Sequence, residues 1–308
     1  LLVLSTALTG KCPYSNVIVN GLVLAQDGKK MSKSLNNYPD IMKVINTYGA
    51  DALRVYLLSS GAVMAEPLKF SEDGVKNILK VTTIPLLSAV KFFEEHLTYF
   101  KKCFSRDLTY KSSSDNVMDQ WILSEVVNLK RKIREDMEEY RLNKIGNYII
   151  HFIDMLNNWY IKFNRRRMKN KTGEEDFDTC LSVLHQVILY FVIIISPFYP
   201  HLSEYIYQKF KSDKHPESVH LYYWVNLPTF KYDLELESKF SLLRQVCNYA
   251  RTYRGKKNIS LKKPFQEVII WFNDHKKVKD LDSLRSYLQE SINASKIIID
   301  HKDIEVSY

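Results

Sequence analysis

Cysteine is scarce and scattered in this chain. Its 308 residues include only Cys12, Cys103, Cys180 and Cys247. None of them belongs to a Cys-x-x-Cys pair, which excludes the zinc sites built on that spacing and favours a reduced compartment over a disulfide scaffold. The sequence also has no His-Glu-x-x-His helix and no Gly-x-Ser-x-Gly nucleophile elbow. We therefore expect no protein-bound metal.

Long hydrophobic runs are missing as well. The longest, Val187–Ile195, has nine residues, whereas a bilayer-spanning helix needs about 20. This run predicts a core helix and no membrane partner. A hydrophobic content of 45% with 13% aromatics indicates a folded, globular protein. The length suggests two or three domains.

Acidic residues are outnumbered by basic ones, 35 to 44, which gives a net charge of +9. Such an excess is typical of proteins that bind polyanions, although it would equally serve solubility. Two stretches contain no acid at all, one between Met155 and Gly173 and the other from Arg251 to Lys263. The second stretch could contact an RNA backbone or could be an exposed linker.

The first acid-free stretch carries a dense basic cluster. Its candidate RNA-binding residues are Lys162, Arg165, Arg166, Arg167 and Lys169. Guanidinium groups suit phosphates and stack on unpaired bases. The alternative is a solvated helix end, where cations also favour the helix dipole. We expect Trp159 and Tyr160, which directly precede the cluster, to lie in the core.

Residues 27–34 read Asp-Gly-Lys-Lys-Met-Ser-Lys-Ser and place three lysines within five positions. Lysines neutralise phosphate oxygens as point charges, and hydroxyls add hydrogen bonds. Gly28 would allow a turn with positive φ. The spacing is not that of a P-loop. A P-loop would need Gly at position 23, where this chain has Val23, and Ser or Thr at position 30, where it has Lys30. A phosphate-binding loop and a basic surface turn both fit this stretch.

Residues 30–34, Lys-Met-Ser-Lys-Ser, match the second signature of class I aminoacyl-tRNA synthetases. Further motifs extend the match, and the chain resembles isoleucyl-tRNA synthetases of the eukaryotic type over nearly its whole length, most weakly after about residue 265. These motifs are Asn20–Ala25, Asn37–Asp40, Tyr48–Arg54, Asn158–Tyr160, Asn164–Arg167 and Ser196–Phe198.

The resemblance implies a function and a set of site residues. Such an enzyme joins isoleucine to ATP as an aminoacyl-adenylate and transfers the acyl group to tRNA. Lys30 and Lys33 would be catalytic, stabilising charge on the departing pyrophosphate. The ATP-binding residues would be Lys30, Met31, Ser32, Lys33 and Ser34, with Mg²⁺ as the counter-ion of ATP. The partners would be tRNA, ATP and isoleucine, and the location cytoplasmic.

The chain also departs from that family. The first class signature, His-x-Gly-His, does not occur in it. We therefore expect a piece of a longer protein that shows no ATP–pyrophosphate exchange by itself. Two alternatives stay open: a valyl-tRNA synthetase, because Ser34-Leu35-Asn36 is closer to that style, and a stand-alone tRNA-binding module without catalysis.

The expected fold is mostly α. We predict the tail of a Rossmann-like α/β catalytic domain over 1–70, a helical anticodon-binding bundle over 71–230, and a small α/β module over 231–308. In the tail we expect the end of a buried helix at 1–9, a buried strand at Val17–Val19, a second at 22–25 and a helix opened by Pro39-Asp40.

Several further elements are predicted from local patterns. Ser71 should cap a helix, and an apolar face should run from Leu142 to Phe163. Asp51 and Arg54, one helical turn apart, should be structural and would pair with each other, and His201 should be packed at a helix start. Strand-like runs should return after Pro216. A helix at 234–253, a strand at 267–272, a helix at 276–290 and a strand at 297–299 should form the last module.

Overall fold

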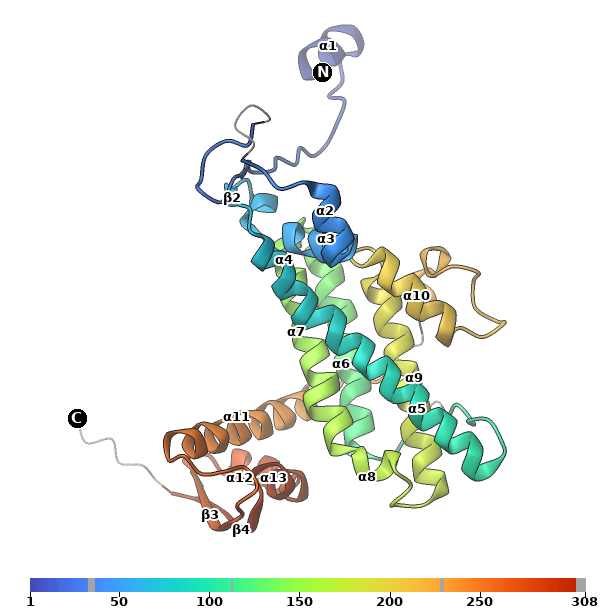
Figure 1. Ribbon diagram of the computed structural model, residues 1–308, viewed down its shortest axis with the longest axis vertical. Helices are drawn as coiled ribbons and strands as arrows, with labels where there is room; N and C mark the ends of the chain where they lie inside the picture. Colours follow the sequence, from blue (N-terminus) through green and yellow to red (C-terminus); the bar gives the residue numbers. More distant parts are fainter. Residues whose placement is uncertain (33–36, 112, 228–229, 303–308) are drawn as a thin grey trace, which may run out of the picture. The chain divides into compact units, whose positions relative to one another are not determined.

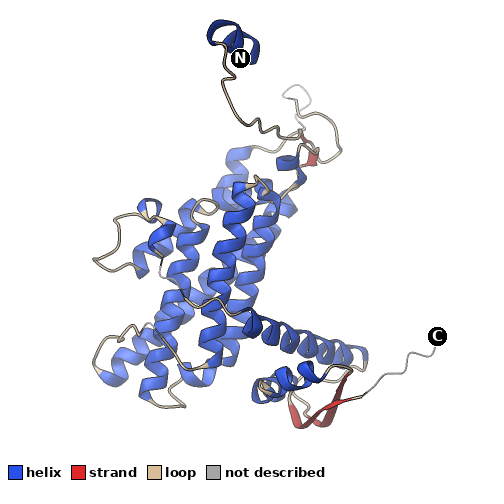
Figure 2. Cartoon of the chain, turned by 180° about the vertical axis from the view of Figure 1, so that it is seen from behind, coloured by secondary structure: helices blue, strands red, loops and turns tan. Residues whose placement is uncertain are grey.

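The computed structural model describes residues 1–32, 37–111, 113–227 and 230–302, and it is mostly helical, as predicted (Figure 1, Figure 2). The chain forms two compact units. The first unit comprises Leu1–Ser105, Leu129–Asn158 and Leu184–Leu227, and the second comprises Arg106–Asn128, Trp159–Val183 and Pro228–Tyr308. Helices α6 (Val117–Glu138) and α9 (Glu174–Ile195) contribute to both units. The predicted boundaries at residues 70 and 230 stay predictions.

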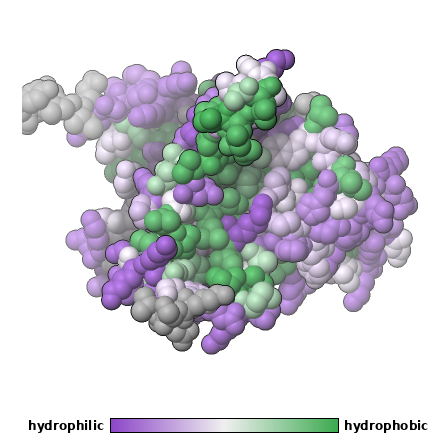
Figure 3. Space-filling view, turned by 90° about the horizontal axis from the view of Figure 1, so that it is seen from above, coloured by the Kyte–Doolittle hydropathy of each residue, from purple (hydrophilic) through white to green (hydrophobic). Residues whose placement is uncertain are grey.

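The first 20 residues differ from expectation. Helix α1 (Leu2–Thr9) forms, but none of its residues is buried. Val17, Ile18 and Val19 form no strand, and their side chains are between 61% and 67% exposed. An apolar run becomes a buried strand only where another element covers it, and no described element does so here. Figure 3, which views the molecule from the end that carries α1, shows hydrophobic residues on that surface.

The next segment of the first unit is a small β pair followed by helices. Strands β1 (Val23–Leu24) and β2 (Leu68–Lys69) pair in parallel, with a 2.8 Å bond from the Leu68 amide to the Leu22 carbonyl. Helix α2 (Ile41–Tyr48) begins directly after the predicted Pro39-Asp40 start, because Asp40 acts as the N-cap and its carboxylate accepts hydrogen bonds from the first-turn amides. Gly49, with φ +87°, separates it from helix α3 (Ala50–Leu58). A 3₁₀ turn, η1 (Gly61–Met64), leads on to β2.

Long helices complete the first unit. Ser71 caps helix α4 (Glu72–Ile78) as predicted, and the π turn η2 (Leu79–Thr83) joins α4 to helix α5 (Ile84–Phe104). The phenyl rings of Phe152 and Phe191 stack at 4.7 Å between helix α7 (Ile145–Asp154) and α9. Gly146 permits close packing, because a Cβ there would lie 1.9 Å from the Ser59 hydroxyl. The other elements are the 3₁₀ turns η3 (Leu142–Lys144), η5 (Val219–Leu221) and η6 (Trp224–Asn226), and helix α10 (Pro200–Phe210).

Two predictions for this region need correction. The apolar face from Leu142 to Phe163 is largely buried as expected, but it runs through η3, α7 and the π turn η4 (Met155–Ile161) instead of one regular helix. The prediction of strand-like runs directly after Pro216 is wrong, because the described residues there form η5 and η6. Helix α9 is long and apolar enough to cross a membrane, but 83% of its most hydrophobic window is buried, as in a core helix.

The last part of the second unit is the predicted α/β module. Helix α11 (Leu234–Lys256) leads into strand β3 (Phe265–Phe272), and β4 (Ala294–His301) pairs with β3 in parallel (Figure 1). The single helix predicted between the strands is instead α12 (His275–Asp282) and α13 (Arg285–Ile292). A short helix, α8 (Arg165–Met168), also belongs to this unit.

Candidate phosphate loop and nucleic-acid interface

A tight turn opens the candidate phosphate loop. The buried Ala25 donates its amide to the Lys29 carbonyl at 2.9 Å and accepts the Gly28 amide at 2.8 Å. Gly28 has φ +83°, and a Cβ there would approach the Lys69 side chain at 3.1 Å. The predicted positive φ is therefore confirmed. The backbone leaves this turn directly into the lysine run.

Asn37 joins the two sides of the loop. Its carboxamide accepts the Ser32 amide at 2.9 Å and donates to the Lys30 carbonyl at 3.1 Å. Lys30 also forms an antiparallel bridge with Leu24 of β1. An Asn side chain offers both a donor and an acceptor, so it can imitate a backbone partner. Sequence reasoning used Asn37 only as part of a motif and missed this role.

The described residues of the loop differ in exposure. Lys30 is exposed, whereas Met31 and Ser32 are half-buried. Lys29 lies 3.9 Å from the Asp27 carboxylate, and both are largely exposed, so this pair is weak. Lys33 and Ser34, the other two predicted site residues, lie outside the described residues. The structure thus describes Lys30, Met31 and Ser32 of the predicted phosphate site.

Asp51 and Arg54 of α3 do not pair with each other, contrary to one expectation. The buried Asp51 carboxylate accepts the Leu202 amide at 2.7 Å and so caps the start of α10. The Arg54 guanidinium donates to the Pro197 carbonyl at 3.1 Å. Both residues therefore hold the segment that begins α10, which is the structural role predicted for them. His201 lies at this helix start but is exposed rather than packed.

The basic cluster of the second unit divides into outward and inward residues. Trp159 and Tyr160 are buried, as predicted. The exposed cations are Lys162, Arg165, Arg166 and Lys169. Arg165 and Arg166 lie on α8, a single turn whose N-cap Asn164 and last residue Met168 are buried, so these two cations are presented from a fixed support.

Arg167 differs from its neighbours, which corrects its assignment to an RNA contact surface. It is 7% exposed, and its guanidinium donates to both carboxylate oxygens of the fully buried Asp119 at 2.9 Å. It also donates to Asp176 at 2.8 Å, while the Tyr160 hydroxyl donates to Asp119 at 2.7 Å. Burial disfavours the charge of Arg167, but these hydrogen bonds outweigh it and raise the pKa of Arg167. Arg167 therefore has a structural role, in which it links its segment to Asp119 and Asp176.

A half-buried arginine of α11 lies beside the exposed cations. The Arg251 guanidinium lies over the Trp159 ring, 5.0 Å from its centroid. Although Lys162 as a whole residue is exposed, partial desolvation of its ammonium, and then the charge of Arg251, lowers the pKa of Lys162. We call the set Lys162, Arg165, Arg166, Lys169 and Arg251 the basic face. Sequence reasoning had noted Arg251 only in the separate acid-free stretch, because nothing local relates it to Trp159.

Arg254, one turn further along α11, points inward. It is 2% exposed, and its guanidinium donates to the carbonyls of Ser260, Lys263, Ile292 and Asn293 at 2.7–3.2 Å. Its guanidinium carbon also lies 3.6 Å from the centre of the Phe265 ring. Arg254 therefore fastens the loop after α11 to the end of α13 and is not available to RNA.

Comparisons with known proteins give a family match for the region of the candidate phosphate loop and for the region of the basic face. A family model described as tRNA synthetases class I (I, L, M and V) matches residues 1–69, and one described as the anticodon-binding domain of tRNA ligase matches residues 119–270. The chain belongs to the class I tRNA synthetases. The phosphate loop lies in the first matched region, and the basic face of this synthetase chain lies in the second.

Relatives of this synthetase chain are named cytoplasmic isoleucine–tRNA ligases. Those of Saccharomyces cerevisiae and Mus musculus are 41% and 37% identical to it, and one named as probable, from Dictyostelium discoideum, is 38% identical, each over 97% of the chain. The chain spans 25–29% of the length of these relatives.

A solved structure supports the fold of the synthetase chain. It is the ternary complex of Agrobacterium radiobacter K84 agnB2 LeuRS with tRNA and LeuAMS, which matches 99% of this chain and 36% of its own. The TM-score is 0.51 at 15% identity, so the likeness concerns the fold alone.

Proposed function

We propose that this chain is part of a cytoplasmic isoleucine–tRNA ligase and supplies its ATP-phosphate loop and a tRNA-binding surface. The observation that carries the proposal is the 37–41% identity to ligases of that name across 97% of the chain. The geometry of the loop and of the basic face supports it. No described feature favours a valyl-tRNA synthetase or a binding module without catalysis.

The loop's residues suit the activation of an amino acid. The carboxylate of isoleucine attacks the α-phosphorus of ATP, and pyrophosphate leaves with its added negative charge. Lys30, together with Lys33, would stabilise that charge, and the Ser32 hydroxyl would position a phosphate oxygen. Met31 would pack at the adenine side. No general base is needed, because the attacking carboxylate is already ionised.

Mg²⁺ would arrive with ATP as its counter-ion. Among the residues that the structure describes, no group of three or more His, Cys, Asp and Glu side chains is arranged to hold a metal ion. Mg²⁺ bound mainly through substrate phosphates is common at nucleotide sites. This arrangement needs no metal cage in the chain.

The basic face would bind tRNA. Lys162, Arg165, Arg166 and Lys169 are exposed and come from one short segment, so they can bind neighbouring phosphates together. Arg251 adds a charge from α11 beside Trp159. Arg167 takes no part in this binding but holds the segment in place through Asp119.

The test is a titration of the 308-residue chain with transcripts of isoleucine tRNA and valine tRNA at several salt concentrations. We expect tighter binding of isoleucine tRNA. Arg165→Ala/Arg166→Ala should weaken it, with a log-affinity against log-salt slope shallower by about 0.7–0.9 for each phosphate that the variant no longer neutralises. Equal binding of both tRNAs would reject the isoleucine assignment. An unchanged slope in the double variant would reject the basic face.

A further inference from the structure

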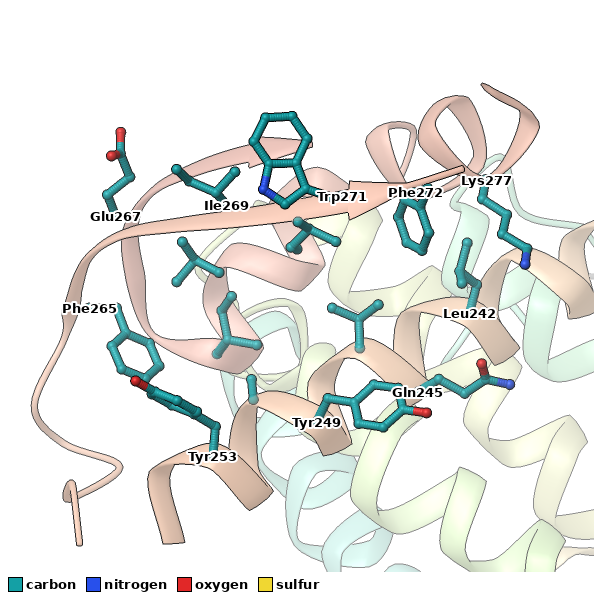
Figure 4. Close-up of a pocket in the computed structure, with 15 residues that line it drawn as sticks. Leu242, Gln245, Tyr249, Tyr253, Phe265, Glu267, Ile269, Trp271, Phe272 and Lys277 are labelled. Atoms are coloured by element: carbon teal, nitrogen blue, oxygen red, sulfur yellow. The ribbon is translucent and has the colours of Figure 1, made fainter. Parts of the chain in front are cut away.

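A second surface of the same unit lies between α11 and β3. It is an apolar groove of about 730 Å³ (Figure 4), within the range of about 300–1,000 Å³ typical of ligand sites. Its α11 wall includes Leu242, Val246, Tyr249, Ala250 and Tyr253, and its strand wall includes Phe265, Val268, Ile270 and Phe272.

Two tyrosines of this groove are largely exposed to solvent. The side chains of Tyr249 and Tyr253 are 74% and 53% exposed, one helical turn apart on α11. Phe265 lies beside Tyr253, with ring centroids 6.3 Å apart (Figure 4). Aromatic faces in this position suit stacking by a planar base, which is worth about 1–3 kcal/mol per base.

The charge of the groove favours a polyanion. No acid occurs in the sequence between Glu237 and Glu267. The acid among the described lining residues, Glu267, points to the other face of β3 in Figure 4 and binds Lys296 at 2.6 Å. Lys277 lines the groove, and four further exposed lysines are close to its residues in the sequence, at 256 and 257 just after Tyr253 and at 262 and 263 just before Phe265.

Polar groups at one end could recognise a nucleotide. Figure 4 shows the Lys277 side chain extending toward the α11 wall, where Gln245 and Leu242 lie. The Gln245 carboxamide has donors and an acceptor for the edge of a base, and the Lys277 ammonium can meet a phosphate. Unpaired nucleotides are recognised by this combination of stacking, edge contacts and cations.

We propose that this groove binds one unpaired nucleotide of tRNA, with its base stacked on Tyr249 and Tyr253 and its phosphate held by Lys277. The proposal rests on the proposed tRNA-binding function and adds a second contact region to the basic face. A protein partner with an apolar segment is a separate reading. The run of cations without a facing acid favours RNA.

The experiment titrates fluorescent isoleucine tRNA with the 308-residue chain at several salt concentrations. Tyr249→Ala/Tyr253→Ala should weaken binding about tenfold, from the loss of stacking, with an unchanged salt slope because the tyrosine rings neutralise no phosphate. Tyr249→Phe/Tyr253→Phe keeps the rings and should bind within about twofold of the unmodified chain. Tyr223→Ala is the matched control, since Tyr223 is 73% exposed and does not line the groove.

A second variant and a cross-link guard against misfolding. Lys277→Ala should make the salt slope shallower by about 0.7, the value for one phosphate of a single strand. Ultraviolet cross-linking of 4-thiouridine tRNA should mark the peptide that contains Tyr249 and Tyr253.

The outcomes separate the two proposals. If the unmodified chain binds no tRNA, the proposed function fails, and the groove assignment falls with it. If the chain binds tRNA but the Tyr→Ala and Lys277→Ala variants bind equally well and the cross-links lie elsewhere, the groove assignment alone is overturned.

Discussion

The three consecutive arginines of α8 should differ in how much each contributes to the free energy of unfolding. Arg167→Ala removes the one member whose guanidinium is buried, with its side chain 8% exposed, and leaves the fully buried Asp119 carboxylate without its bidentate partner. Arg165→Ala and Arg166→Ala remove exposed side chains of the same type from the same turn. They are therefore matched controls for charge, helix propensity and position.

The expected magnitude follows from burial. Removing one partner of a buried ion pair costs about 3–5 kcal/mol, because the other charge stays buried and uncompensated. The Tyr160 hydroxyl still donates to Asp119, so we expect the lower end, about 3 kcal/mol. Loss of the bond to Asp176, which is only partly buried, adds little. Each surface control should move the free energy of unfolding by at most about 0.5 kcal/mol.

Urea unfolding followed by tryptophan fluorescence is a suitable assay, since Trp121 and Trp159 are both buried in the second unit. Arg167→Lys should recover only part of the loss, because an ammonium cannot form the fork to Asp119. Equal unfolding midpoints for Arg167→Ala and Arg165→Ala would refute the reasoning and return Arg167 to the candidate RNA-binding residues.

Three further predictions concern the first unit. In an active protein that carries this loop, Lys30→Ala should slow adenylate formation by about 10²–10³ in single-turnover assays; Asn37→Ala should slow it less, and neither should change isoleucine affinity. Asp51→Ala should cost about 1–2 kcal/mol in thermal unfolding through the lost cap of α10, whereas Thr47→Ala, on the exposed side of α2, should not. Burial lowers the pKa of His185 to about 4, so the unfolded state binds a proton first as pH falls, and stability is lost between about pH 6.5 and 4, by about 2 kcal/mol at pH 5. His185→Gln should remove this part of the pH dependence in urea unfolding at pH 7 and 5.

Local signals in the sequence predicted most of the helices and the last two strands. The predicted cap at Ser71 forms, and the helix expected from Pro39-Asp40 begins there, with Asp40 as its cap. Both signals depend on neighbours within a few residues. The parallel pairing of β3 and β4 follows from the β–α–β order of the chain. These features need only short-range chemistry or a topological rule, so a pattern can reveal them.

Long-range partners were outside the reach of such patterns. Val17–Val19 met the criteria for a buried strand, but burial depends on a covering element that no pattern names. Asp51 was placed correctly on a helix, yet its partner is 151 residues away at Leu202. The role of Asn37 was missed for a different reason, because a side chain that replaces a backbone partner leaves no periodic signal.

Arginines in acid-free stretches show why composition alone could not define an RNA surface. Arg165 is exposed and Arg167, two positions on, is buried; Arg251 is half-buried and Arg254, one helical turn on, is buried. A guanidinium has five donors, and those of Arg254 are directed to four backbone carbonyls. A guanidinium so occupied cannot bind phosphate without breaking its own support. An arginine is therefore a credible RNA ligand only where neither carboxylates nor carbonyls of the chain already take its donors, and that condition becomes visible only in the folded structure.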